Sequence, residues 1–482
     1  MDLVVGIDVA TADVRAVAAD ADGRIHGEGR AGLPQPQSPR PGWCEQDARA
    51  WWPAVATSLR RLSEGLGVAS RSIVGVSVSA TSGTVVAVDS DGEPVGDALM
   101  YSDQRAVDEA DVAQAAGEAR WADLGLRVQP SFGLPKWGWL CRHRDGGRTA
   151  ARLAHPSDVV VGHLVGYLPP TDWSHALKSG YDPRLEQWAE EALGAVGVPL
   201  RLLPEVQAPT TLVGRLSAEA AEQTGLPPTC EVRLGMTDAC TSQLAAGASS
   251  PGRFVSVLGT TLVLKGASRD VVTYPTGAFY SHRHPQGWWL PVGASSTGGA
   301  ALSASFAGRD LVELDALALR HGPSRCIAYP LVGRGERFPF VAPDAEGFVV
   351  GDPVDEVDRY RATLEGVAFV ERLGYEHLAR LGAPAEPPIS ASGAGSGSRA
   401  WNQIRASVLG APLIEEPGAN TALGACILAA AGTLHGDLAA ATEAMALSGE
   451  QVDPEAQERD ALDDSYERFL AALADRGWLG LG

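Results

Sequence analysis

Short apolar runs separated by polar turns make up the start of the chain. Runs and turns alternate in the order Leu3–Ile7, 11–13, Val14–Ala19, 20–23 and a further run from Arg24. Buried-strand runs joined by tight polar turns are typical of an antiparallel meander. This segment therefore predicts three consecutive strands, the first of which ends near Asp8.

A helix and two further strands are predicted next. Asp47 is suited to cap a helix, whose apolar face carries Trp52, Val55, Leu59 and Leu62. Two strand patterns, 73–79 and 84–88, flank the small-residue turn 80–83. Far along the chain, an apolar stripe from Leu364 to Leu381 predicts a helix that Gly382 ends.

The meander pattern recurs in the second half of the chain. A strand pattern at 253–258, a tight turn at 259–261 and a second strand pattern at 262–266 repeat the opening motif. Two copies about half a chain apart predict a duplicated α/β core with a cleft between the halves. The Ala/Ser/Pro/Gly stretch 248–252 marks the boundary.

Composition restricts the environment and the partners. Six scattered cysteines in 482 residues form no Cys-x-x-Cys pair, which favours a reducing compartment. The chain shows no signal-peptide pattern and no apolar run of membrane-spanning length, so we expect a cytoplasmic protein that does not enter a membrane. A net charge of −20 disfavours nucleic acid as a partner. It does not exclude ATP, because Mg²⁺ and backbone dipoles neutralise phosphates locally.

Small-residue turns after buried strands are the candidate phosphate sites. The chain has no P-loop, and Gly393, Gly395 and Gly397 do not have the dinucleotide-binding spacing. Asp8, at the end of the first strand, is placed either to hold Mg²⁺ through water or to cap a turn. Asp238 is either a helix N-cap or a base that accepts a hydroxyl proton. Gly259-Thr260-Thr261 either surrounds phosphates or forms a simple hairpin turn.

Taken together, these stretches resemble the FGGY family of carbohydrate kinases. The resembling segments, in the family's order and across nearly the whole chain, are 6–8, 42–47, 237–238, 258–261, 335–339, 364–368 and 401–405. The family implies an actin/hexokinase-like (ribonuclease H-like) pair of domains with an interdomain active-site cleft. It also implies MgATP and a polyol or ketose acceptor. We expect an N-terminal sugar-binding domain over 1–247 and a C-terminal ATP-binding domain over 248–482, with the last helices free to pack back on the first.

The resemblance implies a role for individual residues. Asp238 corresponds to the general base and contacts the sugar, and Asp8 to the carboxylate that contacts the sugar and Mg²⁺. The residues implied to bind ATP and its phosphates are Thr11, Gly259, Thr260, Thr261, Gly393, Gly395, Ser398 and Trp401. Phosphoryl transfer needs positioning, charge neutralisation and one proton acceptor, which this set supplies. Whether the chain forms a homodimer stays open.

The sugar half is closest to the D-ribulose kinase branch, which resembles xylulose kinases. The similar stretches are 80–84, 98–101, 171–182, 260–265 and 280–282. Xylulose kinases typically carry Gln-Met-His-Gly where this chain has Ala80-Thr81-Ser82-Gly83, and in the branch Ser82 contacts the ketose. The alternative is that Ser82 is an ordinary turn residue. D-ribulose is therefore the first expectation, ahead of D-xylulose or another polyol.

Two departures from the family pattern suggest another reading. The first phosphate turn reads Ala10-Thr11-Ala12-Asp13, which replaces a glycine and adds a carboxylate beside the phosphates. Ala394 replaces a glycine in the adenosine stretch. A catalytically idle sugar- or nucleotide-binding sensor is therefore the alternative of a different class. A partner protein without sugar chemistry conflicts with the matches at 42–47 and 335–337.

Overall fold

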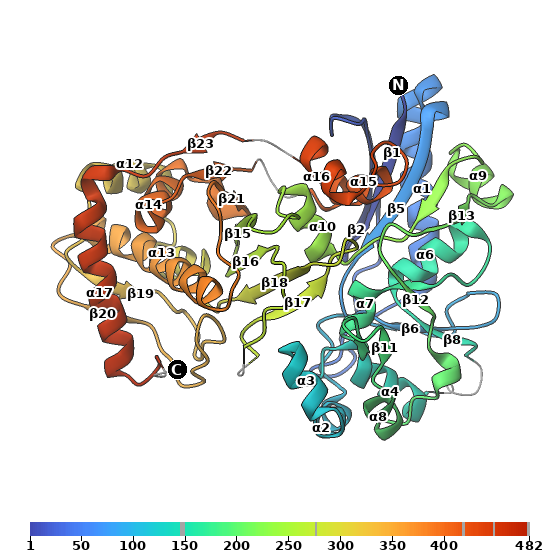
Figure 1. Ribbon diagram of the computed structural model, residues 1–482, viewed down its shortest axis with the longest axis horizontal. Helices are drawn as coiled ribbons and strands as arrows, with labels where there is room; N and C mark the ends of the chain where they lie inside the picture. Colours follow the sequence, from blue (N-terminus) through green and yellow to red (C-terminus); the bar gives the residue numbers. More distant parts are fainter. Residues whose placement is uncertain (145–149, 275–276, 417–419, 447–448, 480–482) are drawn as a thin grey trace. The chain divides into compact units, whose positions relative to one another are not determined.

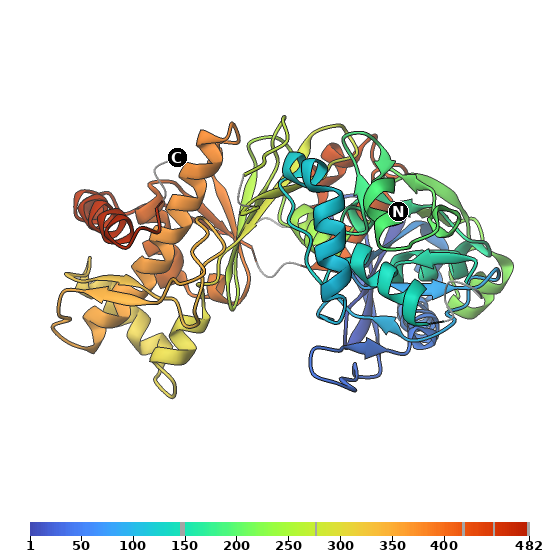
Figure 2. The ribbon, with the colours of Figure 1, turned by 90° about the horizontal axis from the view of Figure 1, so that it is seen from below.

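The computed structural model describes residues 1–144, 150–274, 277–416, 420–446 and 449–479, and the chain forms two compact units. Unit 1 contains Met1–Ala245, His282–Gly287 and Asn420–Ala446. Unit 2 contains Ala246–Ser281, Trp288–Ala419 and Leu447–Gly482. Figures 1 and 2 show their elements from two directions.

A six-stranded mixed sheet forms the centre of unit 1, in the order β13-β14-β5-β1-β2-β3. Its strands are β1 (Leu3–Val9), β2 (Asp13–Ala19), β3 (Ile25–Gly32), β5 (Ile73–Ala80), β13 (Leu212–Arg215) and β14 (Glu231–Arg233). The first three strands pair antiparallel, as the meander pattern predicted, whereas β5 runs parallel to both β1 and β14. Because β1 and β5 end at the same edge, polar residues there are brought together.

Helices and small strand pairs complete unit 1. The helices are α1 (Trp51–Leu66), α2 (Val107–Ala116), α3 (Glu118–Leu124), α4 (Gly133–His143), α6 (Pro156–Val165), α7 (Trp173–Leu177), α8 (Glu190–Ala195), α9 (Ala218–Thr224), α10 (Asp238–Ala245), α15 (Thr421–Ala430) and α16 (Leu438–Met445). The short strands are β4 (Glu45–Gln46), β6 (Val86–Val88), β7 (Ala98–Leu99), β8 (Arg152–Ala154), β9 (Thr171–Asp172), β10 (Tyr181–Asp182), β11 (Gln187–Trp188) and β12 (Val206–Gln207).

Glycines let one helix approach each face of the sheet in unit 1. A Cβ on Gly6 of β1 would lie 1.9 Å from the carbonyl of Ala422 in α15, and one on Gly29 of β3 would lie 2.0 Å from the carbonyl of Ser58 in α1. Side chains alternate along a strand, so the Gly6 face of β1 also carries Asp8. The opposite positions of β1 join α1 in the apolar core.

Residues 420–446 belong to unit 1, and the predicted division at 247/248 left the last helices of the chain free to pack on the first domain. In both ribbon views the red α15 and α16 lie among the blue and green elements of that unit (Figures 1 and 2). Helix α15 consists of small and apolar residues, TALGACILAA, and is buried along its length. Such a helix packs closely on a sheet, but its sequence does not reveal which sheet covers it.

Unit 2 repeats the strand topology of unit 1. Its seven-stranded sheet has the order β17-β18-β16-β15-β21-β22-β23. The strands are β15 (Phe254–Leu258), β16 (Leu262–Gly266), β17 (Tyr280–Arg283), β18 (Trp289–Ala294), β21 (Ile389–Ser392), β22 (Leu413–Glu415) and β23 (Gln451–Val452). The path β18-β16-β15 is antiparallel and β15-β21-β22 is parallel, matching β3-β2-β1 and β1-β5-β14. This correspondence confirms the predicted duplication of an α/β core.

A long helix anchors the core of unit 2. The remaining elements are α11 (Ala300–Ser305), α12 (Leu311–His321), α13 (Glu356–Arg380), α14 (Arg399–Leu409), α17 (Arg459–Asp475), β19 (Ile327–Tyr329) and β20 (Phe348–Val350). Helix α13 ends just before Gly382, which has a φ of 88°, as its sequence predicted. Its buried apolar residues pack against β15, β16 and α14 in one core.

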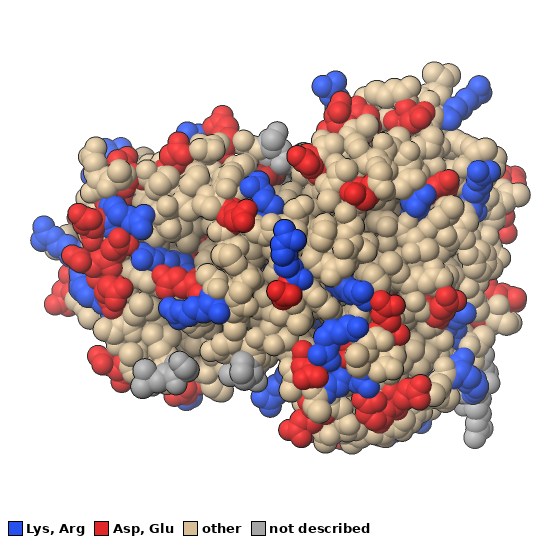
Figure 3. Space-filling model, viewed as in Figure 1, with Lys and Arg blue, Asp and Glu red and all other residues tan. Residues whose placement is uncertain are grey.

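Three further features concern the surface charge, the hydropathy of the helices and the cysteines. Acidic and basic side chains are interspersed over the face shown in Figure 3. No helix in the described part of the chain is long and apolar enough to cross a membrane. All six cysteines are free thiols.

Candidate functional site

Asp8 lies near the end of β1, between Arg15 of β2 and Ser79 of β5 in the strand register. Burial raises the pKa of its carboxyl to about 7, and the neighbouring carboxylates of Asp238 and Asp13 add to the rise, partly opposed by Arg15. The structure therefore brings Asp8 and Asp238 within electrostatic reach of each other, although 229 residues separate them in sequence (238 − 8 − 1). A buried carboxyl crowded by two others is an environment in which a divalent cation would relieve the repulsion.

Asp238 is the first residue of α10 and is half-buried. Its Oδ1 accepts the N–H of the next residue, Ala239, at 2.7 Å. The amides of Cys240 and Thr241 donate to the carbonyl of Thr237. The N-cap residue supplies the carbonyl that accepts the first intrahelical bond, so Thr237 occupies the N-cap position and Asp238 is the first helical residue.

A hydroxyl pair connects the strand beside Asp8 to the helix that carries Asp238. The Oγ of Ser79, the register partner of Asp8, lies 2.8 Å from the Oγ1 of Thr241. Thr241 also donates to the carbonyl of Asp238 at 3.1 Å. Both hydroxyl residues are fully buried, so this link fixes the start of α10 against the sheet edge.

The first phosphate turn is held by a side chain that the sequence analysis did not single out. Gln46, 3% exposed, donates from Nε2 to the carbonyl of Thr11 at 2.9 Å and to that of Pro34 at 2.7 Å. Trp51 donates from Nε1 to the Oε1 of Gln46 at 3.0 Å. The sequence marked Gln46 only as part of the resembling segment 42–47, and it did not show which groups this side chain binds.

The substitution of Ala10 in that turn causes no backbone strain. In the described part of the chain, Glu186 and Thr210 are the only non-glycine residues with positive φ. The amide of Ala10 donates to the carbonyl of Asp13 at 3.1 Å and closes the turn. The effect of Asp13 is electrostatic, since it contributes to the raised pKa of Asp8.

Ser82 lies in the turn after β5, and its hydroxyl is buried without a protein partner. The turn is fastened on both sides: Thr81 and Thr84 share a hydroxyl hydrogen bond of 2.7 Å, and Lys136 donates from Nζ to the carbonyls of Gly83 at 2.8 Å and Met100 at 2.6 Å. Complete burial lowers the pKa of Lys136 to about 7. An orphan hydroxyl on a fixed turn requires a partner, which a water or a sugar hydroxyl supplies.

In unit 2, the turn Gly259-Thr260-Thr261 follows β15, and Thr260 is exposed. Its carbonyls are bound by the start of α11: Gly299 donates to Gly259 at 2.9 Å and Ala300 to Thr260 at 3.1 Å. A Cβ on Gly299 would lie 2.6 Å from the carbonyl of Gly259. The small-residue run 296–299, which sequence reasoning missed, is therefore needed for this close packing.

Gly393 and Gly395 lie directly beside that turn. They follow β21, which runs parallel to β15, and a Cβ on either residue would lie 2.7 Å and 2.6 Å, respectively, from atoms of Leu258. Gly393 also has a φ of 89°, which a residue with a side chain rarely adopts. The two predicted nucleotide loops thus meet at the carboxyl ends of neighbouring parallel strands, where α/β sheets bind ligands.

Ser398 and Trp401 have clear packing roles. The Oγ of Ser398 caps α14 by accepting the amide of Trp401 at 3.0 Å, and it donates to the carboxylate of Asp315 at 2.6 Å. Trp401 is 2% exposed and donates from Nε1 to the carbonyl of Leu364 at 3.1 Å. Asn402 holds the glycine loop by donating to the carbonyl of Ser396 at 2.7 Å. Trp401 is therefore assigned to the core rather than to the nucleotide.

The predicted residues fall into two groups. Asp8, Thr11, Ser82 and Asp238 belong to unit 1, whereas the glycine loops, Ser398 and Trp401 belong to unit 2. No cluster of three or more His, Cys, Asp or Glu suited to a metal occurs among the described residues.

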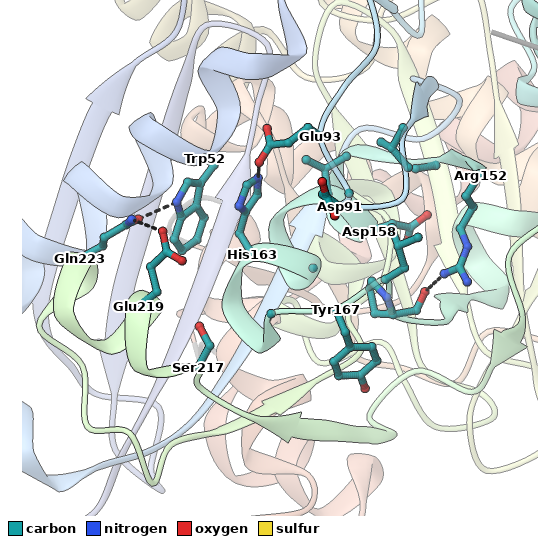
Figure 4. Close-up of a pocket in the computed structure, with 18 of the residues that line it drawn as sticks. Trp52, Asp91, Glu93, Arg152, Asp158, His163, Tyr167, Ser217, Glu219 and Gln223 are labelled. Atoms are coloured by element: carbon teal, nitrogen blue, oxygen red, sulfur yellow. Dashed lines mark hydrogen bonds and ion pairs between the residues drawn. The ribbon is translucent and has the colours of Figure 1, made fainter. Parts of the chain in front are cut away.

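A separate cavity of about 530 Å³ in unit 1 contains none of these residues. Figure 4 shows it between α1, α6 and α9. Trp52 donates to Gln223 at 2.7 Å, Gln223 donates to Glu219 at 3.0 Å, and the Trp52 ring stacks on His163. Several of its polar groups bind one another, and none of the predicted site residues lines it.

Comparisons with known proteins cover nearly the whole chain. Models of the FGGY family of carbohydrate kinases match residues 3–245 (N-terminal domain) and 254–433 (C-terminal domain). A xylulose kinase of Streptomyces coelicolor is 31% identical over 91% of this chain and 89% of its own length. One from Streptomyces rubiginosus is 29% identical, covering 98% of this chain and 96% of its own. The solved structure of a xylulose kinase from Rhodospirillum rubrum superposes with a TM-score of 0.87 at 27% identity, covering 98% of each chain.

Proposed function

The chain belongs to the FGGY family of carbohydrate kinases and is an ATP-dependent phosphotransferase, and we propose that its acceptor is a five-carbon ketose, D-ribulose before D-xylulose. The observation that carries the proposal is the proximity of Asp8 and Asp238, one at the end of a buried strand and the other at the start of a helix. Phosphoryl transfer to an alcohol requires a group that accepts the hydroxyl proton and a means of neutralising charge on the phosphates, and two neighbouring carboxylates can divide these tasks.

Asp238 is the proposed general base. A ketose hydroxyl is a weak nucleophile at neutral pH, and its proton must leave as the new P–O bond forms. The carboxylate of Asp238 accepts that proton, and the Ser79–Thr241 link keeps it oriented. Its half-buried position leaves it accessible to a bound acceptor.

Asp8 is the proposed residue that holds Mg²⁺, through water, beside the phosphates. When bound, the ion neutralises charge on the transferring phosphoryl group. The fit rests on the crowded, buried carboxyl of Asp8, whose pKa of about 7 reflects burial and the repulsion of Asp238 and Asp13. A contact of Asp8 with the sugar is part of the proposal, because Asp8 lies within electrostatic reach of the proposed base Asp238.

The glycine loops of unit 2 are the proposed nucleotide half. Thr260 and Thr261 offer two hydroxyls to phosphate oxygens, whereas the amide of Gly259 closes the turn on the carbonyl of Thr261. The neighbouring Gly393 and Gly395 pack closely on Leu258, which precedes this turn. Thr11 of unit 1 is proposed to contact phosphate from the turn that Gln46 fixes. Ser398 is proposed to help bind the nucleotide indirectly. Its hydroxyl caps α14 and so fixes the loop that precedes this helix.

Ser82 supports D-ribulose as the acceptor. Its buried hydroxyl has no protein partner and is held on a fixed turn, and the Gln-Met-His-Gly stretch typical of xylulose kinases is absent. D-xylulose is the second candidate because the similar proteins are named xylulose kinases. The two sugars differ in the configuration of a single hydroxyl, so one contact is sufficient to reverse the preference.

A coupled assay of ADP release tests the proposal. The purified chain is given MgATP with D-ribulose, D-xylulose, two hexuloses and glycerol in parallel, and the Asp238→Asn variant supplies the background. The proposal expects the highest kcat/KM with D-ribulose. A preference for D-xylulose removes the ribulose assignment, and a preference for glycerol removes the ketose assignment while leaving the kinase family intact.

A second function, binding without chemistry, is favoured by one observation. Asp13 places a carboxylate in the phosphate turn, within electrostatic reach of Asp8. A sensor of this kind would bind a ketose in calorimetry but release no ADP in any arm of the assay.

Two further predictions concern the whole protein. Cell fractionation tests the predicted location in the cytoplasm, and sedimentation tests whether the chain forms a homodimer.

A further inference from the structure

A buried histidine at the start of α7 has no role in the proposed mechanism. Asp172 caps this helix, because its Oδ1 accepts the amides of Ser174 at 2.8 Å and His175 at 3.1 Å. Its other oxygen lies 2.5 Å from the Nδ1 of His175. Asp172 is 2% exposed and His175 is 0% exposed, so this pair lies wholly in the interior of unit 1.

The same cap is connected to the segment that carries Asp238. Ser174 donates its hydroxyl to Asp172 at 2.5 Å, and its Oγ accepts the amide of Thr237 at 3.0 Å. Thr237 directly precedes Asp238. One hydroxyl therefore joins the Asp172 carboxylate to the backbone beside the proposed base, with every group buried.

The charged groups around His175 favour its protonated form. Burial disfavours the imidazolium, but the carboxylate of Asp172 and its hydrogen bond outweigh that effect and raise the pKa of His175. Asp158 of α6 and Asp238 of α10 add to the rise. His155 is a further titratable neighbour, and its ring centroid lies 5.5 Å from that of His175.

The second ring nitrogen of His175 is also informative. Nε2 is buried and has no hydrogen-bond partner, whereas the neighbouring His155 bonds through both nitrogens, to Asp158 and Ser179. A buried ring nitrogen without a partner costs stability, so this arrangement is not explained by stability alone. An imidazolium paired with Asp172 and within electrostatic reach of Asp238 would attract the carboxylate of the base.

We propose that His175 is a positioning residue for Asp238. Held by Asp172, its cationic ring attracts the Asp238 carboxylate and fixes its orientation toward the acceptor, while Ser174 fixes the backbone at Thr237. This inference rests on the proposed role of Asp238 and extends it to a charged support that spans α7 and α10. His175 itself does not touch the acceptor.

Asp172→Asn is the sharpest test. Asn caps a helix as well as Asp does, so the start of α7 is retained while the charge that raises the pKa of His175 is lost. The wild-type kcat should fall as pH rises through the pKa of His175. In the variant that fall should begin at a lower pH, with kcat at pH 8 reduced on the order of tenfold and the KM for ATP unchanged.

Two further variants separate support from structure. His175→Gln should lower kcat at every pH and remove the alkaline fall, because no imidazolium remains. His26→Gln is the matched control: His26 also pairs with an aspartate, Asp20, at 2.7 Å, but on the surface, and its loss should leave the profile unchanged. A purely structural role of His175 would lower the melting temperature without changing the shape of the pH profile.

Histidine NMR of the intact wild-type chain provides a readout that does not depend on activity. The signal of His175, one of the ten histidines, should stay protonated above the ordinary histidine pKa of about 6.5, and Asp172→Asn should shift that signal. An active wild type whose alkaline limb is unmoved by Asp172→Asn, or a His175 that is neutral at pH 7, overturns the inference. A wild type that phosphorylates no ketose overturns the proposed function instead, and the NMR titration then still decides whether the pair is charged.

Discussion

The side-chain amide of Gln46 donates a hydrogen bond of 2.9 Å to the carbonyl of Thr11. A second bond from the same nitrogen reaches Pro34 at 2.7 Å, so a single buried side chain ties the first phosphate turn to the following loop. Turns that present backbone amides to phosphates must be held in place before the ligand arrives, because disorder there would be lost on binding. Gln46 is the residue of the segment 42–47 that performs this task.

Gln46→Glu should therefore weaken ATP binding. The change removes the two donors and places a carboxylate oxygen against two carbonyls, while the acceptor for Trp51 survives. The KM for ATP should rise roughly tenfold, with a smaller effect on kcat, since leaving buried polar groups unpaired costs about 1–3 kcal/mol. The exposed Gln104→Glu serves as the control in steady-state kinetics. An unchanged KM for ATP would show that the turn does not need this bond.

Asp13→Asn should have the opposite effect. Asp13 raises the negative potential near Asp8, as its contribution to the pKa of that residue indicates, and it should repel the phosphates. Removing its charge should lower the KM for ATP about two- to fivefold with little change in kcat, the pattern of altered uniform binding. Asp22→Asn, in the exposed next turn, is the matched control. If both variants behave like the wild type, Asp13 does not face the nucleotide.

Ser82→Ala should affect the sugar rather than ATP. The hydroxyl of Ser82 is buried and has no protein partner, so the ketose is its expected partner. Losing that bond should cost about 0.5–1.5 kcal/mol, which raises the KM for D-ribulose about two- to tenfold. Ser90→Ala, in the exposed turn after β6, controls for a nonspecific effect. Equal increases in both KM values would contradict a direct contact with the sugar.

Asp238→Asn should reduce kcat by about 10²–10⁴-fold while both substrates still bind, because Asn is nearly isosteric but accepts no proton. The rival role as helix cap is one that Asn fills equally well. In the structure α10 begins at Asp238, and Thr237 supplies the carbonyl that accepts the amide of Thr241. Kinetics and calorimetry on the same preparation separate chemistry from binding. Near-native kcat with every ketose would remove Asp238 as the base.

Asp8→Asn should stabilise the chain at alkaline pH in the absence of Mg²⁺. The folded pKa of about 7 lies above the unfolded value near 3.8. Between these values the folded chain holds a proton that the unfolded chain releases, so wild-type stability falls as pH rises through the window. The variant does not titrate, and its advantage should grow to on the order of 4 kcal/mol by pH 8 and vanish below pH 4.

Denaturation of the intact chain at pH 4 and pH 8, with and without Mg²⁺, measures the difference in stability between the wild type and Asp8→Asn. Added Mg²⁺ should stabilise the wild type at pH 8 and narrow the gap to Asp8→Asn, because the cation relieves the repulsion among the three carboxylates. Asp22→Asn should show no gap at either pH. A gap that is constant across the pH range would mean that the carboxyl of Asp8 is not perturbed by folding.

Local patterns were sufficient for much of the fold. The strands β1, β2, β15 and β16 and the end of α13 lie where apolar runs, polar turns and Gly382 predicted them. These features depend on residues near one another in sequence: a turn residue fixes local φ, and alternation sets which side of a strand is buried. The repeated strand–turn–strand motif also predicted the duplication, and the motif order predicted the family.

Only the tertiary structure shows which distant residues contact one another. The sequence contains Gln46, His175 and the residues 421–430, but it does not show what they contact. Only the structure shows that Gln46 binds the carbonyl of Thr11, that Ser174 connects Asp172 to Thr237, and on which sheet the helix 421–430 packs. Trp401 was expected at the nucleotide and instead fills the core of unit 2. A motif identifies which residue types are present, whereas a hydrogen bond or a buried charge depends on which distant segments packing brings together, and no local pattern encodes that distance.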